Sequence, residues 1–457
     1  MATEKSIEPV SRPKLARKLG LFDATMIVMG GIIGSGIFIN PYVAARQVHT
    51  PFLIISVWAL GGLIALAGAF IYAELAARRP EVGGQYAYIR EAYHPSVAFV
   101  YGWGLLLVTQ TGGMAAVAVT FAHYFSTLIS KPVSTALIAT VVLAALTVVN
   151  CIGVKTGATV QNVLMVLKIF AIGAVIAVGL FGGSQQVLTQ SLLDRPFSGD
   201  LLTAVGAAMI PVLFAYGGWQ TASFVAGEIR EPEKNLTRGL IIGVVGVILL
   251  YLAMNFVDLK VLGPGGLAST ETPASDVMRA SFGEAGARAI AAGIAVSTLG
   301  FLSQGMLTAP RVYYAMAEDG LFFKRVGWLH PRTRVPVVAI AMQGATAIII
   351  ALSGRYEQIL NYVVSVDFIF FGLTATCVFV LRRRDAAAEK RATKYNIPGH
   401  PLTTLFFVVS CWVVVLNTIY KYPKNSFIGI AILAAGIPVY ALWKKDPRGA
   451  GKSNLKR

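Results

Sequence analysis

Long apolar segments alternate with short polar ones along nearly the whole chain. Twelve of these segments approach the length that a helix needs to cross a hydrocarbon core, about 20 residues. They cover residues 21–47, 52–77, 96–123, 133–150, 157–181, 201–227, 237–262, 288–316, 336–353, 357–381, 402–420 and 426–443. Because lipid offers no hydrogen-bond partner to an exposed backbone, each span must be helical. The pattern predicts an all-α integral membrane protein with about 12 transmembrane helices.

The first span contains an interruption. Residues 27–38 read IVMGGIIGSGIF, with several glycines and a serine in the middle of an apolar run. A helix break in the bilayer is tolerated only where it lines a protein cavity, since each unpaired backbone group costs several kcal/mol. The two half-helices would present free N–H groups and free carbonyls, which suit the carboxylate and the ammonium of a zwitterion. The alternative is that these glycines only allow close helix packing.

The sixth span repeats this feature, because Pro211 is followed by the sequence FAYGGW at 214–219. Broken helices at matching places in two five-helix halves indicate an inverted-repeat transporter with its site at the midplane. We therefore expect five units: a cytoplasmic tail at 1–20, repeats at 21–181 and 201–381, two further helices at 402–443, and a basic tail at 444–457.

The net charge of +17 at first indicates a nucleic-acid partner. However, with both termini in the cytoplasm, most of the 39 Lys and Arg residues fall on the inner side of the predicted spans. This is the distribution that orients membrane proteins. The sequence thus predicts a multi-pass protein of the cell (inner) membrane with cytoplasmic termini, embedded in the lipid bilayer and without a nucleic-acid partner.

Polar side chains within the spans are candidates for function. Lys168 lies about halfway along span 5, where a charge costs about 2.5–3.5 kcal/mol on insertion scales. It therefore needs a partner or a function, unless it snorkels to an interface. Asp367 in span 10 must face protein or water, and substrate contact, proton transfer and packing all stay open for it. Ser297 and Gln304 are seven residues apart and share one face of span 8, although hydroxyls in membrane helices often bond only to their own backbone.

The remaining reactive residues give no sign of catalysis. The three cysteines have no metal-ligand spacing, and the five histidines are scattered near span ends. Phosphate-binding loops, zinc-binding helix pairs and nucleophile motifs are not recognisable. We expect no metal, no cofactor and no enzymatic activity. The glycine- and tyrosine-rich loop at 80–90 is expected to lie along the membrane face or to re-enter it.

The order of these motifs resembles the amino acid–polyamine–organocation superfamily, and most closely its L-type amino acid transporter branch. The resemblance extends from about Leu19 to Trp443. It is carried by residues 31–38, 83–93, 150–155, 160–161 with Lys168, 214–219, 297–298, 317–320, 330–333 and 436–440. It implies a LeuT-type fold, in which two inverted five-helix repeats with broken helices 1 and 6 are followed by two further helices.

The resemblance also implies a site. Backbone N–H groups near Gly34, Ser35 and Gly36 would bind the substrate carboxylate. Carbonyls of Ile32, Phe214 and Gly217 would bind its amine, with the Phe214 ring as a gate. The implied substrate-binding set is Ile32, Gly34, Ser35, Gly36, Ile37, Phe214, Ala215, Tyr216 and Gly217. We expect Gly36 and Gly217 to be required, because a Cβ there would meet the ligand or need unfavourable dihedral angles.

Two further groups of residues follow from the resemblance. Lys168 would place its ammonium where sodium-coupled relatives hold a cation, between carbonyls near Gly30 or Gly31 and the hydroxyl of Ser297 or Thr298. A candidate side-chain pocket comprises Gly112, Gly113, Trp219, Phe301 and Asp367.

The expected function is sodium-independent exchange or uniport of small neutral L-amino acids by alternating access. A proton-coupled symporter and a non-transporting receptor of the same fold are the alternatives. The loop at 126–132 lacks the cysteine with which animal relatives bond a partner, so no covalent heavy-chain subunit is expected. Gln220-Thr221-Ala222 and Asp367 depart from common family residues, and they leave the preferred substrate side chain open.

Overall fold

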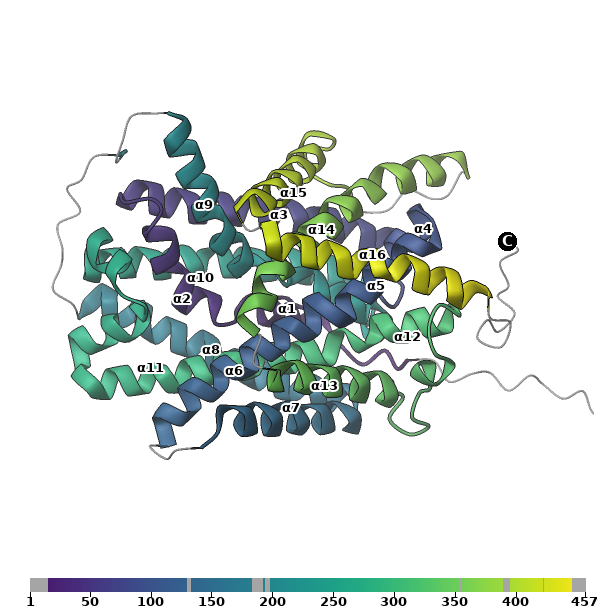
Figure 1. Ribbon diagram of the computed structural model, residues 1–457, viewed down its shortest axis with the longest axis horizontal. Coiled ribbons are helices and arrows are strands. Elements are labelled where there is room, and N and C mark those ends of the chain that lie inside the picture. Colours follow the sequence, from purple (N-terminus) through teal and green to yellow (C-terminus); the bar gives the residue numbers. More distant parts are fainter. Residues whose placement is uncertain are drawn as a thin grey trace, which may run out of the picture.

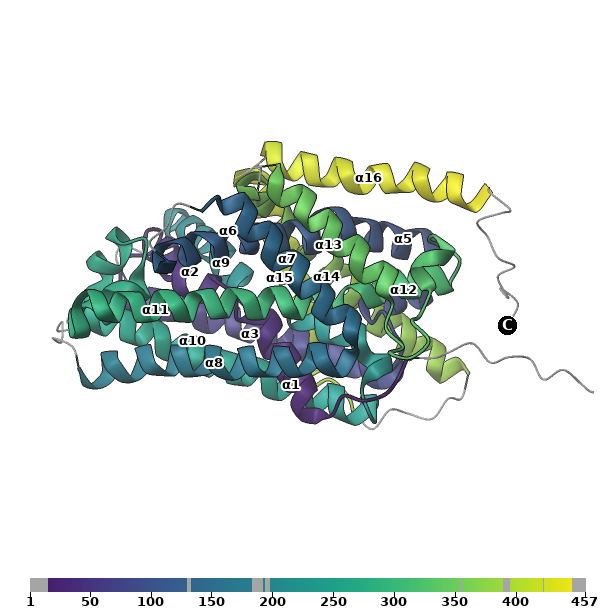
Figure 2. The ribbon, with the colours of Figure 1, turned by 90° about the horizontal axis from the view of Figure 1, so that it is seen from below.

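The computed structural model describes residues 15–129, 133–182, 192–193, 198–353, 356–388, 395–421 and 423–445. These residues form helices joined by turns, with an isolated bridge between Leu19 and Ile229. The elements are α1 (Leu21–Ile32), α2 (Gly36–Ala45), α3 (Pro51–Arg78), α4 (Gln85–Ala92), α5 (Pro95–Gly104), η1 (Leu105–Thr109), α6 (Gln110–Ile129), α7 (Thr135–Ile152), α8 (Val154–Phe181), α9 (Gly199–Tyr216), η2 (Trp219–Glu228), α10 (Pro232–Ser269), α11 (Pro273–Thr308), α12 (Pro310–Glu318), η3 (Lys324–Gly327), α13 (Val337–Leu352), α14 (Tyr356–Ala387), α15 (Leu402–Lys421) and α16 (Pro423–Lys445). Most of them run along one long axis (Figures 1 and 2).

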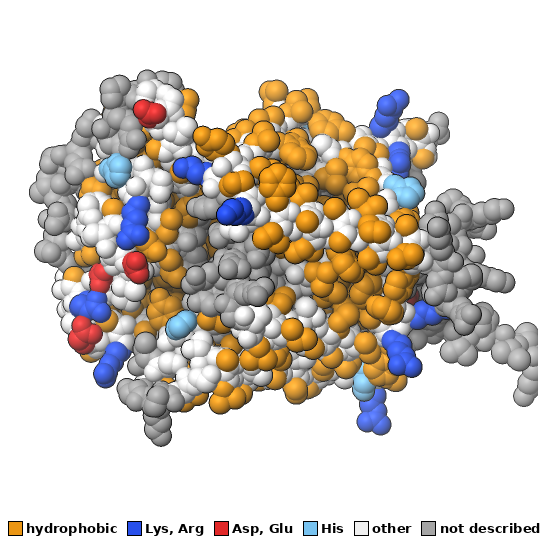
Figure 3. Space-filling model, in the orientation of Figure 1, with side chains coloured by type: hydrophobic (Ala, Val, Ile, Leu, Met, Phe, Trp, Pro, Cys, Tyr) orange, Lys and Arg blue, Asp and Glu red, His pale blue; other side chains and the backbone are white. Residues whose placement is uncertain are grey.

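Each of the twelve predicted spans corresponds to one helix or to two or three consecutive helical elements. Among the described residues, ten helices are long and apolar enough to cross a membrane, or eleven when the bent pair α1–α2 counts as one span. Helix α13 is apolar but has only 16 residues. Apolar side chains cover much of the surface between the two ends of the long axis, whereas charged side chains lie mostly toward those ends (Figure 3). This distribution is that of a protein whose lateral surface faces lipid.

The two interrupted spans lie side by side and run in opposite directions. Helix α2 packs on α9, and α1 packs on η2. The α1–α2 pair is bent by 41° at the break. The α9–η2 pair changes from α-helix to 3₁₀-helix across Gly217 and Gly218. Both breaks therefore fall at the same level of the bundle, as an inverted repeat requires.

The loop predicted at 80–90 is built into the protein. Its second half begins helix α4, where the side chains of Tyr86 and Tyr88 are fully buried. Gly83 and Gly84 both have positive φ values, 89° and 42°. A Cβ on Gly84 would overlap Ser223 of η2. These glycines thus allow the chain to turn tightly against the second broken helix before α4 starts.

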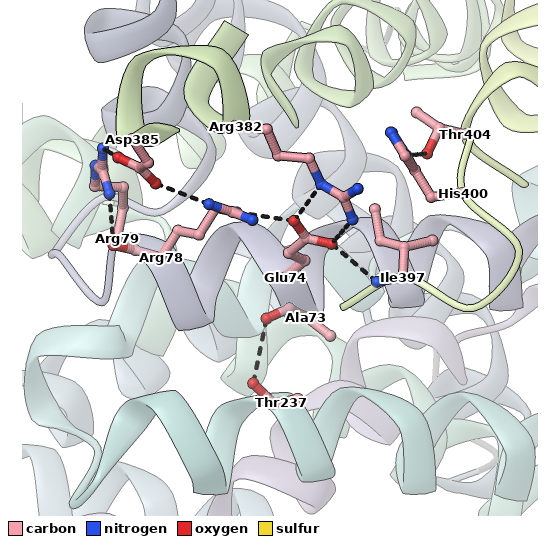
Figure 4. A network of polar contacts seen from close by, with 10 residues as sticks. All are labelled: Ala73, Glu74, Arg78, Arg79, Thr237, Arg382, Asp385, Ile397, His400 and Thr404. Carbon is pink, nitrogen blue, oxygen red and sulfur yellow. Dashed lines mark hydrogen bonds and ion pairs between the residues drawn. The ribbon is translucent and has the colours of Figure 1, made fainter. Parts of the chain in front are cut away.

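A network of charges joins α3 to α14 at one end of the molecule (Figure 4). The Glu74 carboxylate is fully buried and accepts hydrogen bonds from Arg78 Nε (2.8 Å) and from Arg382 Nε and Nη2 (2.7 and 2.6 Å). It also accepts the backbone N–H of Ile397 at 2.8 Å, which ties the segment before α15 to α3. Asp385 accepts from Arg78 at 2.8 Å and extends the network along α14.

His400 lies beside this network, and its Nδ1 is 2.9 Å from the Thr404 hydroxyl of α15. Partial burial, followed by the positive charge of Arg382, lowers the pKa of His400 below its ordinary value. The imidazole is therefore neutral near pH 7 and does not add to the arginine charge around Glu74.

Candidate functional site

The two helix breaks are in direct contact with each other. A Cβ built on Gly36 would lie 3.2 Å from both Cα and Cβ of Ala215, and one built on Gly31 would lie 2.5 Å from the Gly218 carbonyl oxygen. Asn40 on α2 adds a side-chain hydrogen bond to the carbonyl of Pro211, at 2.7 Å. Such close backbone approach is possible because these positions carry little or no side chain.

The glycine requirement in the second break differs from the expectation. Gly217 has φ −69° and ψ 163°, an ordinary extended conformation, and its Cβ would reach only 3.4 Å from the Phe214 carbonyl oxygen. The dihedral angles of Gly217 therefore do not require glycine, and the other ground for the expectation, that a Cβ there would meet the ligand, stays a prediction. Its neighbour Gly218 has φ 105°, and a Cβ there would overlap the carbonyl of Gly31. Gly218 is the position that demands glycine.

At the end of α1, three consecutive carbonyls each contact a side chain from a different helix. The Ile32 carbonyl is 3.2 Å from the Tyr251 hydroxyl of α10. The Ile33 carbonyl accepts a hydrogen bond from the Lys168 ammonium of α8. The Gly34 carbonyl accepts one from the Ser297 hydroxyl of α11 at 3.0 Å. The break thus leaves carbonyls that the surrounding helices satisfy, as a broken helix in a membrane requires.

Lys168 is fully buried, as its mid-span position predicts. Its backbone partner is Ile33, however, and not the expected Gly30 or Gly31, because the helix still continues through those two glycines. The Thr298 hydroxyl bonds back to Ala295 in its own helix.

The other half-helix offers the opposite polarity. Helix α2 begins at Gly36, and its N-cap residue Ser35 makes no side-chain capping hydrogen bond. The first N–H groups of a helix have no intrahelical acceptor, and they carry the positive end of the helix dipole. An anion at this end would be bound by backbone alone.

Both breaks open on one cavity, which encloses about 980 Å³ of empty space including its open mouth. Eleven of the predicted site residues line it: Gly31, Ile32, Gly34, Ser35, Gly36, Gly113, Phe214, Ala215, Gly217, Phe301 and Asp367. Asp367 is the only charged side chain among the described residues of its wall. In the described ranges, no three His, Cys, Asp or Glu residues are grouped as metal ligands.

Other predicted residues lie behind the cavity wall. Ile37 is fully buried in the core. The Tyr216 ring packs against Trp58 and Tyr251, with centroids 5.8 and 5.0 Å away. Trp219 stacks on Phe371 with centroids 5.6 Å apart. Gly30, Gly112, Lys168, Ser297 and Thr298 also do not line the cavity. These residues support the site from behind.

Several cavity residues were not predicted. Gln85 and Tyr101 line the cavity, and the Tyr101 hydroxyl is hydrogen-bonded to Gln85 Oε1 at 3.2 Å. Gln304 donates to the Thr221 hydroxyl at 2.5 Å, and both residues belong to the wall. The spacing of Gln304 from Ser297 did indicate that both side chains face the same way. No comparable spacing in the sequence indicated that Gln85 of α4 and Tyr101 of α5 would line the cavity.

A helical membrane protein in which two antiparallel broken helices enclose a cavity is a secondary transporter of the LeuT-type fold. Sequence comparison defines it further: the chain belongs to the amino acid permease family, whose model matches residues 19–443. It is therefore a membrane transporter and not an enzyme.

Individual relatives match along nearly the whole chain. The chain is 31% identical to the serine/threonine exchanger SteT of Bacillus subtilis (strain 168), covering 94% of this chain and 98% of that protein. It is 28% identical to the human large neutral amino acids transporter small subunit 2, covering 95% and 82%. It is also 28% identical to the mouse Asc-type amino acid transporter 1, covering 96% and 83%.

Proposed function

We propose that this protein exchanges small neutral L-amino acids across the cell membrane, without sodium, by alternating access. The observation that carries the proposal is the cavity on which both helix breaks open. Its wall includes the N-terminal end of α2 at Gly36 and the C-terminal end of α1 at Ile32. These ends complement a carboxylate and an ammonium on one small molecule.

Sodium independence is supported by Lys168. Its ammonium contacts the Ile33 carbonyl at the break and is fully buried. A sodium ion bound at this carbonyl would lie beside a like charge, and such repulsion is strong at short distance. The built-in cation thus takes the place of a transported one.

The neutral character of the substrate is supported by the names of the relatives, which differ in the side-chain size that they give. SteT is named a serine/threonine exchanger, and the human relative is named for large neutral amino acids. We propose exchange rather than uniport because SteT is named an exchanger. The wall glycines and Ala215 leave the backbone of both helix breaks accessible to the charged ends of a ligand, and the small size of the substrate is the part of the proposal that a size series of competitors tests.

Counterflow in proteoliposomes tests the proposal. Vesicles loaded with unlabelled L-alanine should take up labelled L-alanine much faster than empty vesicles, and equally fast in sodium and choline buffers. The methyl ester and the N-acetyl derivative of alanine should not compete, because each removes one charged end. Uptake that requires sodium, or undiminished competition by both derivatives, would contradict the proposal.

We also propose that both termini face the cytoplasm and that no covalent partner subunit is needed. The end of the molecule where α3 and α14 finish carries Arg78, Arg79, Arg382, Arg383 and Arg384. Basic residues of this kind are retained on the cytoplasmic side. Labelling of single cysteines introduced at Arg383 and at Lys421, from either side of sealed vesicles, tests this orientation.

A further inference from the structure

One part of the cavity wall is acidic and polar, and it is formed by α14, η1 and α6. Asp367 on α14 lines the cavity, and its side chain is hydrogen-bonded to Thr109 of η1. Gln110, the first residue of α6, lines the cavity next to Thr109. We refer to Asp367, Thr109 and Gln110 as the polar corner.

The π-helical turn η1 explains why two consecutive residues face the cavity. The Gln110 N–H bonds to the Leu105 carbonyl five residues earlier, and the Thr111 hydroxyl bonds to the Leu106 carbonyl. A π-turn widens the helix locally and is frequent at functional sites. In a regular α-helix, neighbouring side chains point about 100° apart. The widened turn thus brings both Thr109 and Gln110 to the wall.

The polar corner has more hydrogen-bond acceptors than donors. A carboxylate has about four acceptor positions, and the Thr109 hydroxyl fills one. No Lys or Arg lines the described wall. The basic side chains that are fully buried among the described residues are engaged elsewhere, Lys168 by Ile33 and Arg311 by Glu228 at 2.7 Å. Because Asp367 lines the cavity, its remaining acceptors are available to a ligand there.

We infer that Asp367 determines specificity, and that the site takes short amino acids whose side chain ends in a hydrogen-bond donor, either a hydroxyl or an ammonium. The inference rests on the proposed function and adds the substrate side chain to it, and for substrates that end in an ammonium it widens the proposed neutral class by one positive charge. A ligand that ends in a methyl group displaces water from this half-buried carboxylate without filling its remaining acceptors, which is unfavourable. A ligand donor of the same size fills that acceptor.

Three probes of equal heavy-atom count test the inference: norvaline, homoserine and 2,4-diaminobutyrate end in a methyl, a hydroxyl and an ammonium. Each competes against labelled L-alanine in proteoliposomes. With the wild-type protein, homoserine and 2,4-diaminobutyrate should each compete at least about fivefold better than norvaline, which corresponds to about 1 kcal/mol. Either probe competing no better than norvaline overturns the inference for that donor.

Two substitutions separate charge from hydrogen bonding. In Asp367→Leu, both advantages over norvaline should disappear. In Asp367→Asn, an acceptor oxygen remains, so homoserine should keep its advantage while 2,4-diaminobutyrate loses at least about threefold relative to homoserine. Asp200→Asn, at an exposed position at the start of α9, is the matched control and should leave all three values unchanged.

The ratio of inhibition constants is taken within each variant, so it does not depend on the amount of protein inserted. Advantages that survive in Asp367→Leu would show that this carboxylate does not contact the substrate side chain. If Asp367→Leu does not exchange alanine, the probe ratios in Asp367→Asn decide. Failure of the wild-type protein to exchange alanine at all would instead contradict the proposed function.

Discussion

Gly217 and Gly218 are neighbours, yet only one of them needs to be glycine. Gly218 combines φ 105° with a Cβ position that overlaps the Gly31 carbonyl, whereas Gly217 is extended and has space. We predict that Gly218→Ala abolishes alanine exchange, because the strain of a positive φ, about 1–3 kcal/mol, adds to a backbone collision between the two breaks.

Gly217→Ala is the matched control for this prediction. It should insert and retain exchange within about threefold of wild type, a difference of less than 1 kcal/mol. Uptake and thermal stability in detergent are measured for both variants. Normal exchange by Gly218→Ala would contradict the observed contact between the breaks.

Lys168 can be tested in the same assay. We predict that Lys168→Met slows sodium-free exchange by at least about tenfold, since a buried hydrogen bond from a charged group is worth about 1.5–3 kcal/mol. The substitution keeps a long unbranched side chain, one atom shorter, but removes the ammonium that contacts Ile33. Lys155→Met, a half-exposed lysine on the same helix, is the control. Full activity of Lys168→Met would mean that this ammonium does not hold the break.

At the residue scale, the sequence indicated chemistry better than geometry. The charge of a lysine in the middle of an apolar span is enough to predict that it has a partner. Which carbonyl is the partner, that of Ile33 or that of Gly31, depends on where α1 ends. The sequence does not show which of Gly217 and Gly218 has a positive φ, and only the backbone angles in the structure distinguish them.

At the scale of elements, Tyr251 of α10 links the two broken helices. Its hydroxyl lies 3.2 Å from the Ile32 carbonyl of α1 and 3.2 Å from the Ala215 carbonyl of α9. Because a hydroxyl has one proton, it satisfies one carbonyl at a time and leaves the other available. Helix α10 therefore contacts the backbone of both broken helices through this one hydroxyl.

We predict that Tyr251→Phe raises the concentration for half-maximal alanine exchange by about 2- to 12-fold, the range of one net hydrogen bond of 0.5–1.5 kcal/mol. The ring contacts with Trp58 and Tyr216 would remain. Stability in detergent should change little for the same reason. A large loss of stability without a change in half-maximal concentration would assign Tyr251 to packing alone.

The order of elements was predictable, but some of their internal breaks were not. Glycine clusters predicted the breaks after α1 and α9, since each interrupts an apolar span. The π-turn η1 lies in LLLVT, an ordinary helical sequence. Nothing in these residues distinguishes a π-turn from a regular α-helix, so the turn could not be predicted. The polar corner could not be located without it, although Asp367 itself stood out as a charge in a span.

At the scale of the whole molecule, the Glu74 network fastens helices that are far apart in the sequence. One carboxylate receives four hydrogen bonds from α3, α14 and the segment before α15. From the sequence, Glu74, Arg78 and Arg79 were recognisable as polar residues at the end of the second span. The sequence did not show that Arg382, some 308 residues later, completes the set.

We predict that Glu74→Gln lowers the melting temperature in detergent by several degrees. Removing one partner of a fully buried ion pair costs about 3–5 kcal/mol. We expect about 2 kcal/mol or more here, because the Arg382 side chain is 27% exposed and partly hydrated. Glu271→Gln, at an exposed position, is the control. An unchanged melting temperature would show that the network does not hold this end together.

The buried ammonium of Lys168 has a consequence for energetics. Because Lys168 is part of the fold, no cation has to enter or leave with the substrate, so under the proposed function a cycle that carries a zwitterion moves no net charge as long as this ammonium keeps its proton. The membrane potential then does no work on the exchange, and only the concentration gradients of the two exchanged amino acids drive it. A substrate with an additional ammonium at Asp367 would carry one charge per molecule, worth about 2.3 kcal/mol per 100 mV. One cavity would then be electrically silent for serine and driven by voltage for 2,4-diaminobutyrate.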